Sequence, residues 1–371
     1  MMVNKYSPNY AIHPGEYLAE VLESRAISQS EFAQRTGLSA KTINHILSGK
    51  ASYSTEVALV FERTLGISAN IWIGLLEKYN LFEARKEEHR KFKDRSYIKW
   101  LKQFPLSDLT KLKLVRKTRN TAEKVEDLMK FLNIASPEAW KQVDNHHLAY
   151  YRKNTNFKET SQATAIWLHL ARRIAERKPA IPNFTKEKLE GILPEIRRLT
   201  LLKQSEAMVQ LESICAQVGL RFVLLPEFKD THLSGAAFWI QSTPIITPSL
   251  RYKRNDHFWF SFFHEVGHIL RHGKKGIYLD SFLSEGKIDS LKEEEQEANQ
   301  FAANHLISES KWEEVKLINP ISEQSIKGFA KKIEIHPGII VGRLQREGLI
   351  PYNKLNDLKE KWDLVDSKIE I

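Results

Sequence analysis

The sequence predicts a mainly α-helical protein with a small antiparallel β-sheet, an α+β fold, and three observations favour it. Apolar residues recur at helical spacing through most of the chain before Gly219. Short runs with the composition of strands occur only after that residue. The length of 371 residues exceeds what one typical core organises. We therefore expect an all-helical domain at 1–82, a charged linker and helical middle segment at 83–218, and a C-terminal domain at 219–371.

The composition is that of an ordinary globular chain, with 42% hydrophobic and 27% charged residues. Lys and Arg number 56 against 46 Asp and Glu, and the net charge of +10 favours an anionic partner such as nucleic acid. The N-terminus lacks the apolar segment of a signal peptide, and no apolar run reaches membrane-spanning length. We expect a cytoplasmic protein without membrane association, whose single cysteine, Cys215, is a buried apolar residue.

The N-terminal part, about 15–80, predicts a compact all-helical unit. Ser28 is placed to cap one short helix, Gly37 to end it, and Ser39 to cap a second helix over 41–47. Two short helices joined by a turn that contains glycine form a helix-turn-helix.

The second of these helices can bury Ile43, Ile46 and Leu47 while turning polar side chains outward. Such side chains bond base edges or phosphates in the major groove. The alternative is a three-helix packing unit with a solvated polar face. The candidate DNA contacts are Gln29, Ser39, Lys41, Thr42, Asn44, His45 and Lys50.

These residues also resemble a known family. The segments 29–33, 36–39 and 43–50 resemble the Xre family of bacterial and phage repressors, and 13–16, 65–68 and 72–79 are most similar to its HigA-type antitoxin branch. The resemblance implies a homodimer on a palindromic operator in double-stranded DNA.

The strand-like runs are 220–225, 235–240 and 244–247, with turns expected at Pro226 and around Gln241. They predict a small antiparallel sheet just before the most informative motif of the chain. The exposed edge of such a sheet could bind an extended peptide by strand addition.

That motif is His264-Glu265-Val266-Gly267-His268. Histidines four residues apart on a helix lie on one face, so both imidazoles reach the same cation, and Glu265 is placed to activate a metal-bound water. The alternative is an ordinary helix in which the pattern occurs by chance. A catalytic zinc site needs a third protein ligand, which has to come from elsewhere in the chain.

The best candidate for the third ligand is Glu295. It shares one helical stripe with Asn299 and several small residues, which would let the helix approach another backbone closely. Asn299 could then bond the free ring nitrogen of His264. Glu294 and Glu297 are the rival ligands, and His272 is expected to be a supporting or surface residue.

Residues 259–272, followed by 295–302 and 306–307, resemble the ImmA/IrrE metallopeptidases, which cleave repressor proteins to release phage, mobile-element or stress genes. The resemblance implies a zincin-like domain in which His264, His268 and Glu295 hold Zn²⁺, while Glu265 passes a proton from the attacking water to the leaving amine. A further donor to the substrate is expected, with three candidates left unranked: His257, Tyr278 and His305.

Residues 329–344 repeat the pattern of 32–47, with His336-Pro337 where Ser39-Ala40 stands. They predict a helix-turn-helix-like element packed on the C-terminal domain, with DNA contact by Arg343 or Gln345 as a minor alternative.

Together the two resemblances predict a DNA-binding transcriptional regulator with a zinc-dependent endopeptidase. Its protein substrate would be a repressor or a cognate toxin in a stress, phage or mobile-element, or toxin–antitoxin circuit. One alternative is a HigA-like antitoxin or repressor whose peptidase-like domain is a non-catalytic sensing or interaction module. Another is a peptidase whose N-terminal domain binds a partner protein instead of DNA.

Overall fold

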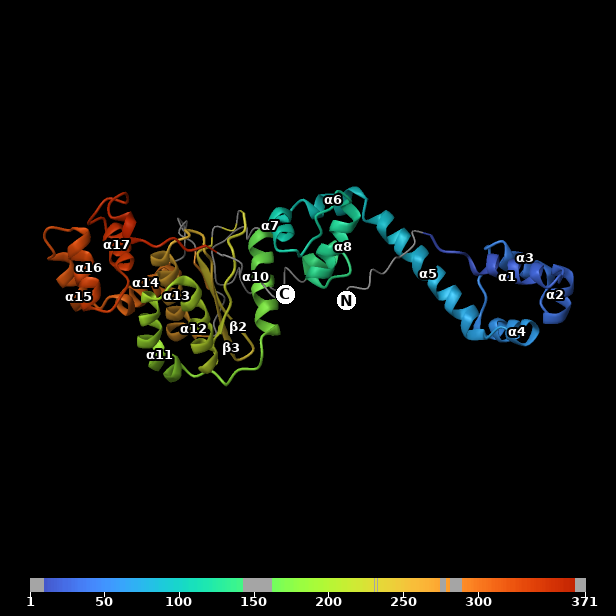
Figure 1. Cartoon of the computed structure of the whole chain (residues 1–371), viewed down its shortest axis with the longest axis horizontal. Helices are drawn as coiled ribbons and strands as arrows, with labels where there is room; N and C mark the ends of the chain where they lie inside the picture. The colour runs from blue at the N-terminus through green and yellow to red at the C-terminus, as the bar shows by residue number, and fades with distance from the viewer. Residues whose placement is uncertain are drawn as a thin grey trace. The chain divides into compact units, whose positions relative to one another are not determined.

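The computed structural model describes residues 10–142, 162–229, 231, 233–273, 278–280 and 289–363 (Figure 1). Contacts divide the chain into two compact units: Met1–Ile98 with Thr118–Glu126, and Lys99–Lys117 with Asp127–Ile371. Each unit has a hydrophobic core of its own.

The first unit starts with a succession of capped helices. The Ser28 Oγ accepts the N–H of Glu31, and the Ser39 Oγ accepts the N–H of Thr42 at 3.0 Å, so both predicted N-caps are present. Gly37 ends the earlier of these helices at φ 70°, a left-handed conformation that is unstrained only without a Cβ. The helices are α1 (Pro14–Ser24), α2 (Gln29–Thr36), α3 (Ala40–Leu47), α4 (Thr55–Leu65) and α5 (Ala69–Lys91).

The hydrophobic core of this unit packs against the apolar face of α3. Leu18, Phe32, Ile43, Phe61 and Trp72 are each fully buried. The Phe61 ring contacts those of Phe32 and Trp72 at centroid distances of 5.4 and 5.5 Å. Because Ile43 faces this cluster, the opposite face of α3 is left to solvent, as a recognition helix requires.

The start of the charged linker expected from residue 83 continues α5 without a break to Lys91. Ion pairs within the helix, Lys86 with Glu83 and Arg90 with Glu87, link exposed side chains one turn apart. The helices α6 (Arg95–Leu101) and α8 (Thr121–Leu132) contribute residues to both units, and α7 (Leu106–Lys111) belongs to the second.

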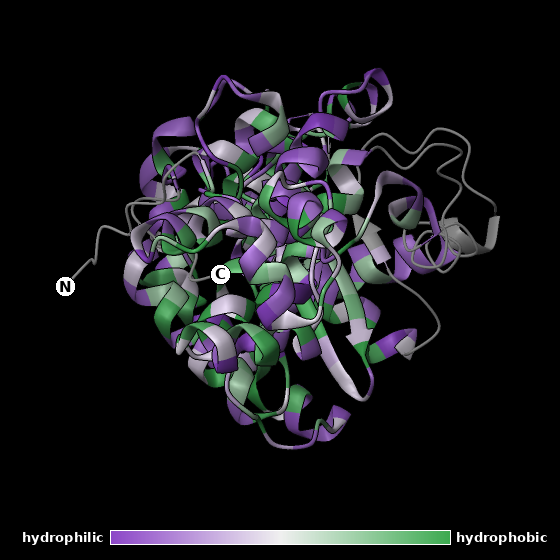
Figure 2. Cartoon of the chain, turned by 90° about the vertical axis from the view of Figure 1, so that its right-hand side faces the viewer, coloured by the Kyte–Doolittle hydropathy of each residue, from purple (hydrophilic) through white to green (hydrophobic). Residues whose placement is uncertain are grey.

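The second unit is built around one buried helix, α13 (Asn255–Arg271), which packs on the sheet, on α14 and on α17. Its centre from Phe262 to Leu270 is buried throughout. Most helices carry both hydrophobic and hydrophilic residues (Figure 2), as expected for helices that bury one face and expose the other. The other helices are α10 (Gln162–Arg177), α11 (Lys186–Arg198), η1 (Leu199–Leu201), α12 (Gln204–Gln217), α14 (Asp289–Leu306), α15 (Glu309–Lys316), α16 (Glu323–Lys332), α17 (Pro337–Arg346) and η3 (Asn356–Leu358).

The sheet has four strands in the order β1-β3-β2-β4. The expected hairpin is present: β2 (Gly235–Ile240) and β3 (Thr243–Pro248) are antiparallel, with Gln241 at φ 54° in the turn. The predicted α+β fold with a small sheet is confirmed, but the sheet is mixed, because the short β1 (Arg221–Phe222) runs parallel to β3. Strand β4 (Tyr278–Asp280) pairs with β2 and was not predicted.

Close approach of α13 and α14 depends on small residues. A Cβ at Gly267 would lie 3.1 Å from the Cα of Ala298, tighter than ordinary contact. The glycine at the centre of the motif and the alanine facing it therefore let the two backbones come together, as expected from the small residues of the later helix.

The repeated pattern near the C-terminus forms the helix pair α16 and α17. The His336 Nδ1 accepts the N–H of Gly338 at the start of α17. Gln345 is 2% exposed, and its amide donates to the carbonyl oxygen of Lys354. Arg343 donates to the carbonyl oxygens of Ala303 and Ile307. The two helices pack on each other, and α17 packs on α13. The DNA contact considered for Arg343 or Gln345 is not supported, because both side chains bind within this unit.

Replacing Arg197 by methionine should lower the free energy of unfolding by about 2 kcal/mol, as expected for losing hydrogen bonds from a charged donor. The Arg197 guanidinium donates to the carbonyl oxygens of Leu306, Ile333 and Glu334, at or next to the C-terminal ends of α14 and α16. Urea unfolding measures the change. The control is Arg198→Met, since Arg198 is exposed and its ion pair spans 3.8 Å; equal effects of the two changes would contradict the assignment.

Among the described residues, no helix is long and apolar enough to cross a membrane. Cys215 is buried, as expected, and burial raises the pKa of its thiol.

Candidate metal centre and nucleic-acid interface

The two motif histidines meet inside the second unit. His264 and His268 lie one turn apart on α13 and are 1% and 0% exposed. Their Nε2 atoms are 3.0 Å apart, so the two ring nitrogens point at the same place. Such convergence follows from the four-residue spacing once the helix forms.

Glu295 on α14 completes the cluster. Its Oε2 lies 3.6 Å from the Nε2 of His264 and its Oε1 lies 3.7 Å from the Nε2 of His268. Ligand atoms about 2.0–2.1 Å from a tetrahedral zinc ion are separated by about 3.3–3.4 Å. The three separations scatter around that value, so these residues fit a zinc ion, which the structure does not contain.

The rival carboxylates lie elsewhere. The Glu297 carboxylate is 64% exposed and is 3.9 Å from His272, and Glu294 does not join the group of three. The Nε2 of His272 contacts the carbonyl oxygen of Glu294 at 3.2 Å. Within the described residues, the one cluster with metal-ligand geometry contains Glu295.

The Asn299 side chain contacts His264 from the next turn of α14. Its Oδ1 lies 3.2 Å from the Nδ1 of His264, which is the contact expected from the sequence. Arg346 on α17 donates to the same oxygen at 3.0 Å. Its part in the site was not predicted, because no local spacing connects a residue on α17 to one on α14.

Glu265 is fully buried and lies next to the start of β2. A Cβ on Gly235 would come within 2.8 Å of the Oε1 of Glu265, so the glycine lets this carboxylate lie against the strand without shifting. The contact between Gly235 and Glu265 was also not visible in the sequence, since it depends on how the sheet packs on α13.

Of the three candidate substrate donors, Tyr278 is nearest to the cluster. Its ring stacks on that of His268 with centroids 4.4 Å apart. His305 instead stacks on Phe301, and burial lowers its pKa. Burial also lowers the pKa of His257, which stacks on Tyr252 two turns before the motif. The stacking of Tyr278 places the short edge strand β4 beside the cluster.

The candidate DNA contacts cluster around α3 in the first unit. Gln29, Ser39, Lys41, Asn44 and Lys50 are exposed. Thr42 and His45 are half-buried at the edge of the same face. The Ser39 hydroxyl also contacts the Thr42 hydroxyl at 2.8 Å, so capping fixes the start of the helix that would enter a groove.

Comparison with known proteins assigns both parts of the chain. Residues 18–72 match the helix-turn-helix family model, and residues 215–332 match the IrrE N-terminal-like domain of peptidase family M78. The uncharacterized HTH-type transcriptional regulator YddM of Escherichia coli strain K12 is 32% identical over 73 residues, which make up 20% of this chain and 78% of that protein.

Two solved structures are also similar. A putative antidote protein of a plasmid maintenance system from Nostoc punctiforme is 29% identical, with TM-score 0.22, covering 22% of this chain and 91% of the other. An addiction module antidote protein of the HigA family from Coxiella burnetii is 28% identical, with TM-score 0.21, covering 23% and 92%.

The N-terminal match and the M78 match coincide with the two sites described above. The chain therefore belongs to the helix-turn-helix transcriptional regulators and joins to that DNA-binding domain an ImmA/IrrE-like domain of peptidase family M78.

Proposed function

We propose that this protein is a DNA-binding transcriptional regulator whose C-terminal domain is a zinc-dependent endopeptidase. Its substrate would be a repressor or partner protein in a stress, phage or mobile-element, or toxin–antitoxin circuit. The observation that best supports an enzyme is that the ligand atoms of His264, His268 and Glu295 lie within 4.8 Å of one another. Glu265 is buried on α13, the helix that carries both histidines.

In this proposal His264, His268 and Glu295 hold the zinc ion. When bound, zinc polarises the peptide carbonyl and makes water easier to deprotonate. Glu265 removes the proton from the attacking water and returns it to the leaving amine. Asn299 holds the tautomer and orientation of His264 through its contact with the Nδ1. The substrate backbone would lie along the sheet edge at β4.

Peptide-bond cleavage is tested with an extract of cells that lack the protein. Purified protein loaded with zinc is added to the extract, and new N-termini are identified by mass spectrometry. A parallel sample is treated with a chelator that removes zinc. Zinc-dependent new termini would support the enzyme; protein that retains zinc but generates none would favour the non-catalytic module.

The DNA-binding half is proposed to act as a homodimer on a palindromic operator. The exposed face of α3 would enter the major groove, with Asn44 reading bases and Lys41 and Lys50 bonding phosphates. The basic composition supports this partner, since the whole chain has a net charge of +10.

The Lys50→Ala change should weaken binding to the protein's own promoter similarly on all DNA sequences and reduce the log–log salt slope by about 1. Asn44→Ala should instead cost about 1–3 kcal/mol, mainly on the operator. Fluorescence anisotropy at several salt concentrations measures both changes. Lys86→Ala on α5 is the charge-matched control. Binding that does not depend on salt would favour a protein partner for this domain.

A further inference from the structure

A cavity of about 580 Å³ lies between α13, α14 and α17. None of the three predicted metal ligands lines it, but Asn299, which contacts His264, does. Its volume falls within the range of about 300–1,000 Å³ that is typical of small-molecule sites.

One side of the cavity is apolar. Phe260 from α13, Ala303 and Leu306 from α14, and Ile339 from α17 line it. Leu306 and Ile339 are each 3% exposed, so packing against the core fixes their side chains. An apolar group that entered here would meet a preformed wall.

Three cations and two carboxylates line the cavity: Arg343, Arg346 and Lys359 against Asp256 and Glu347. Both carboxylates already lie next to cations: Asp256 is 2.7 Å from Lys359, and Glu347 is 2.8 Å from Arg343. Arg346 adds a further positive charge to the lining and lies over the Phe260 ring at 4.0 Å. A guanidinium presents a planar set of N–H donors that matches a carboxylate, and this one borders an aromatic surface.

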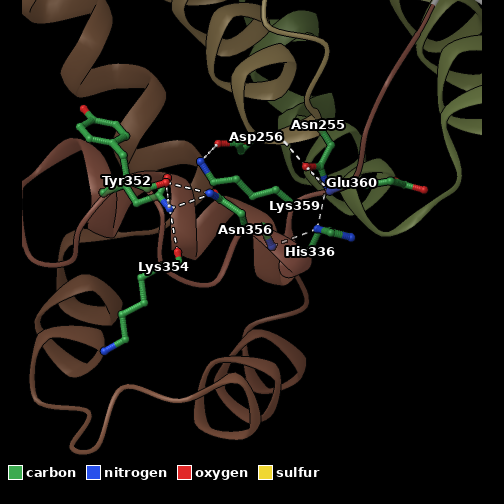
Figure 3. A network of polar contacts seen from close by, with 10 residues as sticks. Asn255, Asp256, His336, Tyr352, Lys354, Asn356, Lys359 and Glu360 are labelled. Atoms are coloured by element: carbon green, nitrogen blue, oxygen red, sulfur yellow. Dashed lines mark hydrogen bonds and ion pairs between the residues drawn. The ribbon is translucent and has the colours of Figure 1, made fainter.

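Residues 352–360 close one side of the cavity, and a network of polar contacts holds them in place (Figure 3). The Asn255 Oδ1 accepts the N–H of Glu360, and the Asn356 amide donates to the carbonyl oxygen of Tyr352. In Figure 3 Lys359 reaches across to Asp256. These contacts fix the position of Lys359 in the absence of a ligand. Less conformational entropy is therefore lost when a ligand binds.

We propose that this cavity binds a carboxylate with an apolar body, the carboxylate lying against Arg346 and the apolar body against Phe260 and Ile339. Asn299 lines the cavity and also contacts His264, so the ligand lies beside the candidate metal centre. Binding requires neither zinc nor cleavage.

The test is isothermal titration calorimetry of full-length, zinc-free protein with the probe N-acetyl-Leu-Phe, which has a free C-terminal carboxylate. Binding with a Kd below about 1 mM is expected. The C-terminal amide of the same probe should bind about tenfold to a hundredfold more weakly, since it lacks the charge. Absence of binding, or equal binding of acid and amide, overturns the proposal. A failure to cleave proteins leaves this result unaffected.

Two variants locate the ligand. Arg346→Gln should weaken probe binding by about tenfold to a hundredfold. Ala303→Leu should weaken it by filling the apolar side. Lys327→Gln on α16 removes one exposed charge outside the cavity and is the control. Thermal melting of each variant verifies folding; binding that survives both cavity changes places the ligand elsewhere and contradicts the proposal.

A third probe, 3-phenylpropionate, distinguishes the source of the carboxylate. Binding of the dipeptide alone assigns the cavity to the C-terminal end of a peptide. Binding of both probes assigns it to apolar carboxylates generally, including small metabolites. Binding of neither is the negative result already described.

Discussion

Replacing Glu265 by glutamine should reduce peptide-bond cleavage by about 10²- to 10⁴-fold, the usual contribution of a general acid–base group. Glutamine has the same shape and keeps the space next to Gly235 filled, but it cannot accept the proton of the attacking water. The new N-termini generated in a cell extract by zinc-loaded protein measure the effect.

Zinc content and thermal melting serve as controls for Glu265→Gln, because this residue is outside the predicted ligand set. Both should stay at the wild-type level. If the variant produced the same new termini as the wild type, Glu265 could not be the proton carrier. If it lost zinc as well, its role would be that of a ligand or a structural residue.

Replacing Glu295 by glutamine should lower the affinity for zinc by more than about 100-fold. Removing a residue that only supports a metal ligand lowers the affinity by about 10- to 100-fold. The Glu295 carboxylate is the acidic group that meets both Nε2 atoms among the described residues. Competition with a fluorescent zinc indicator measures the affinity.

The matched controls are Glu294→Gln and Glu297→Gln, which remove the same charge from the same helix. Both should keep zinc affinity within a few-fold of the wild type, because neither carboxylate belongs to the cluster. If Glu297→Gln lost zinc and Glu295→Gln retained it, the third ligand would be Glu297, on the other face of α14.

Local signals predicted the elements of the site well. The caps Ser28 and Ser39 and the glycine at position 37 act over a few residues, so helix boundaries follow from the sequence. The spacing of His264 and His268 fixes their common face as soon as a helix forms. The stripe on α14 likewise predicted that Glu295 and Asn299 lie on the packed face.

Features that depend on tertiary packing were not predicted. Gly235 lies against Glu265 because β2 packs on α13, and Arg346 reaches Asn299 from another helix. The parallel pairing of β1 and the addition of β4 depend on where the chain returns to the sheet, which residue composition does not encode. The roles of the site residues and the three-part division at 82 and 218 stay predictions.

The most direct test of the proposed metal centre is the zinc X-ray absorption spectrum of the purified full-length protein. The proposed ligand set predicts imidazole scattering from His264 and His268 together with one carboxylate, and loss of that signal in His268→Ala. Protein that retains no zinc, or a spectrum without imidazole scattering, would contradict the proposed metal centre and the peptidase built on it.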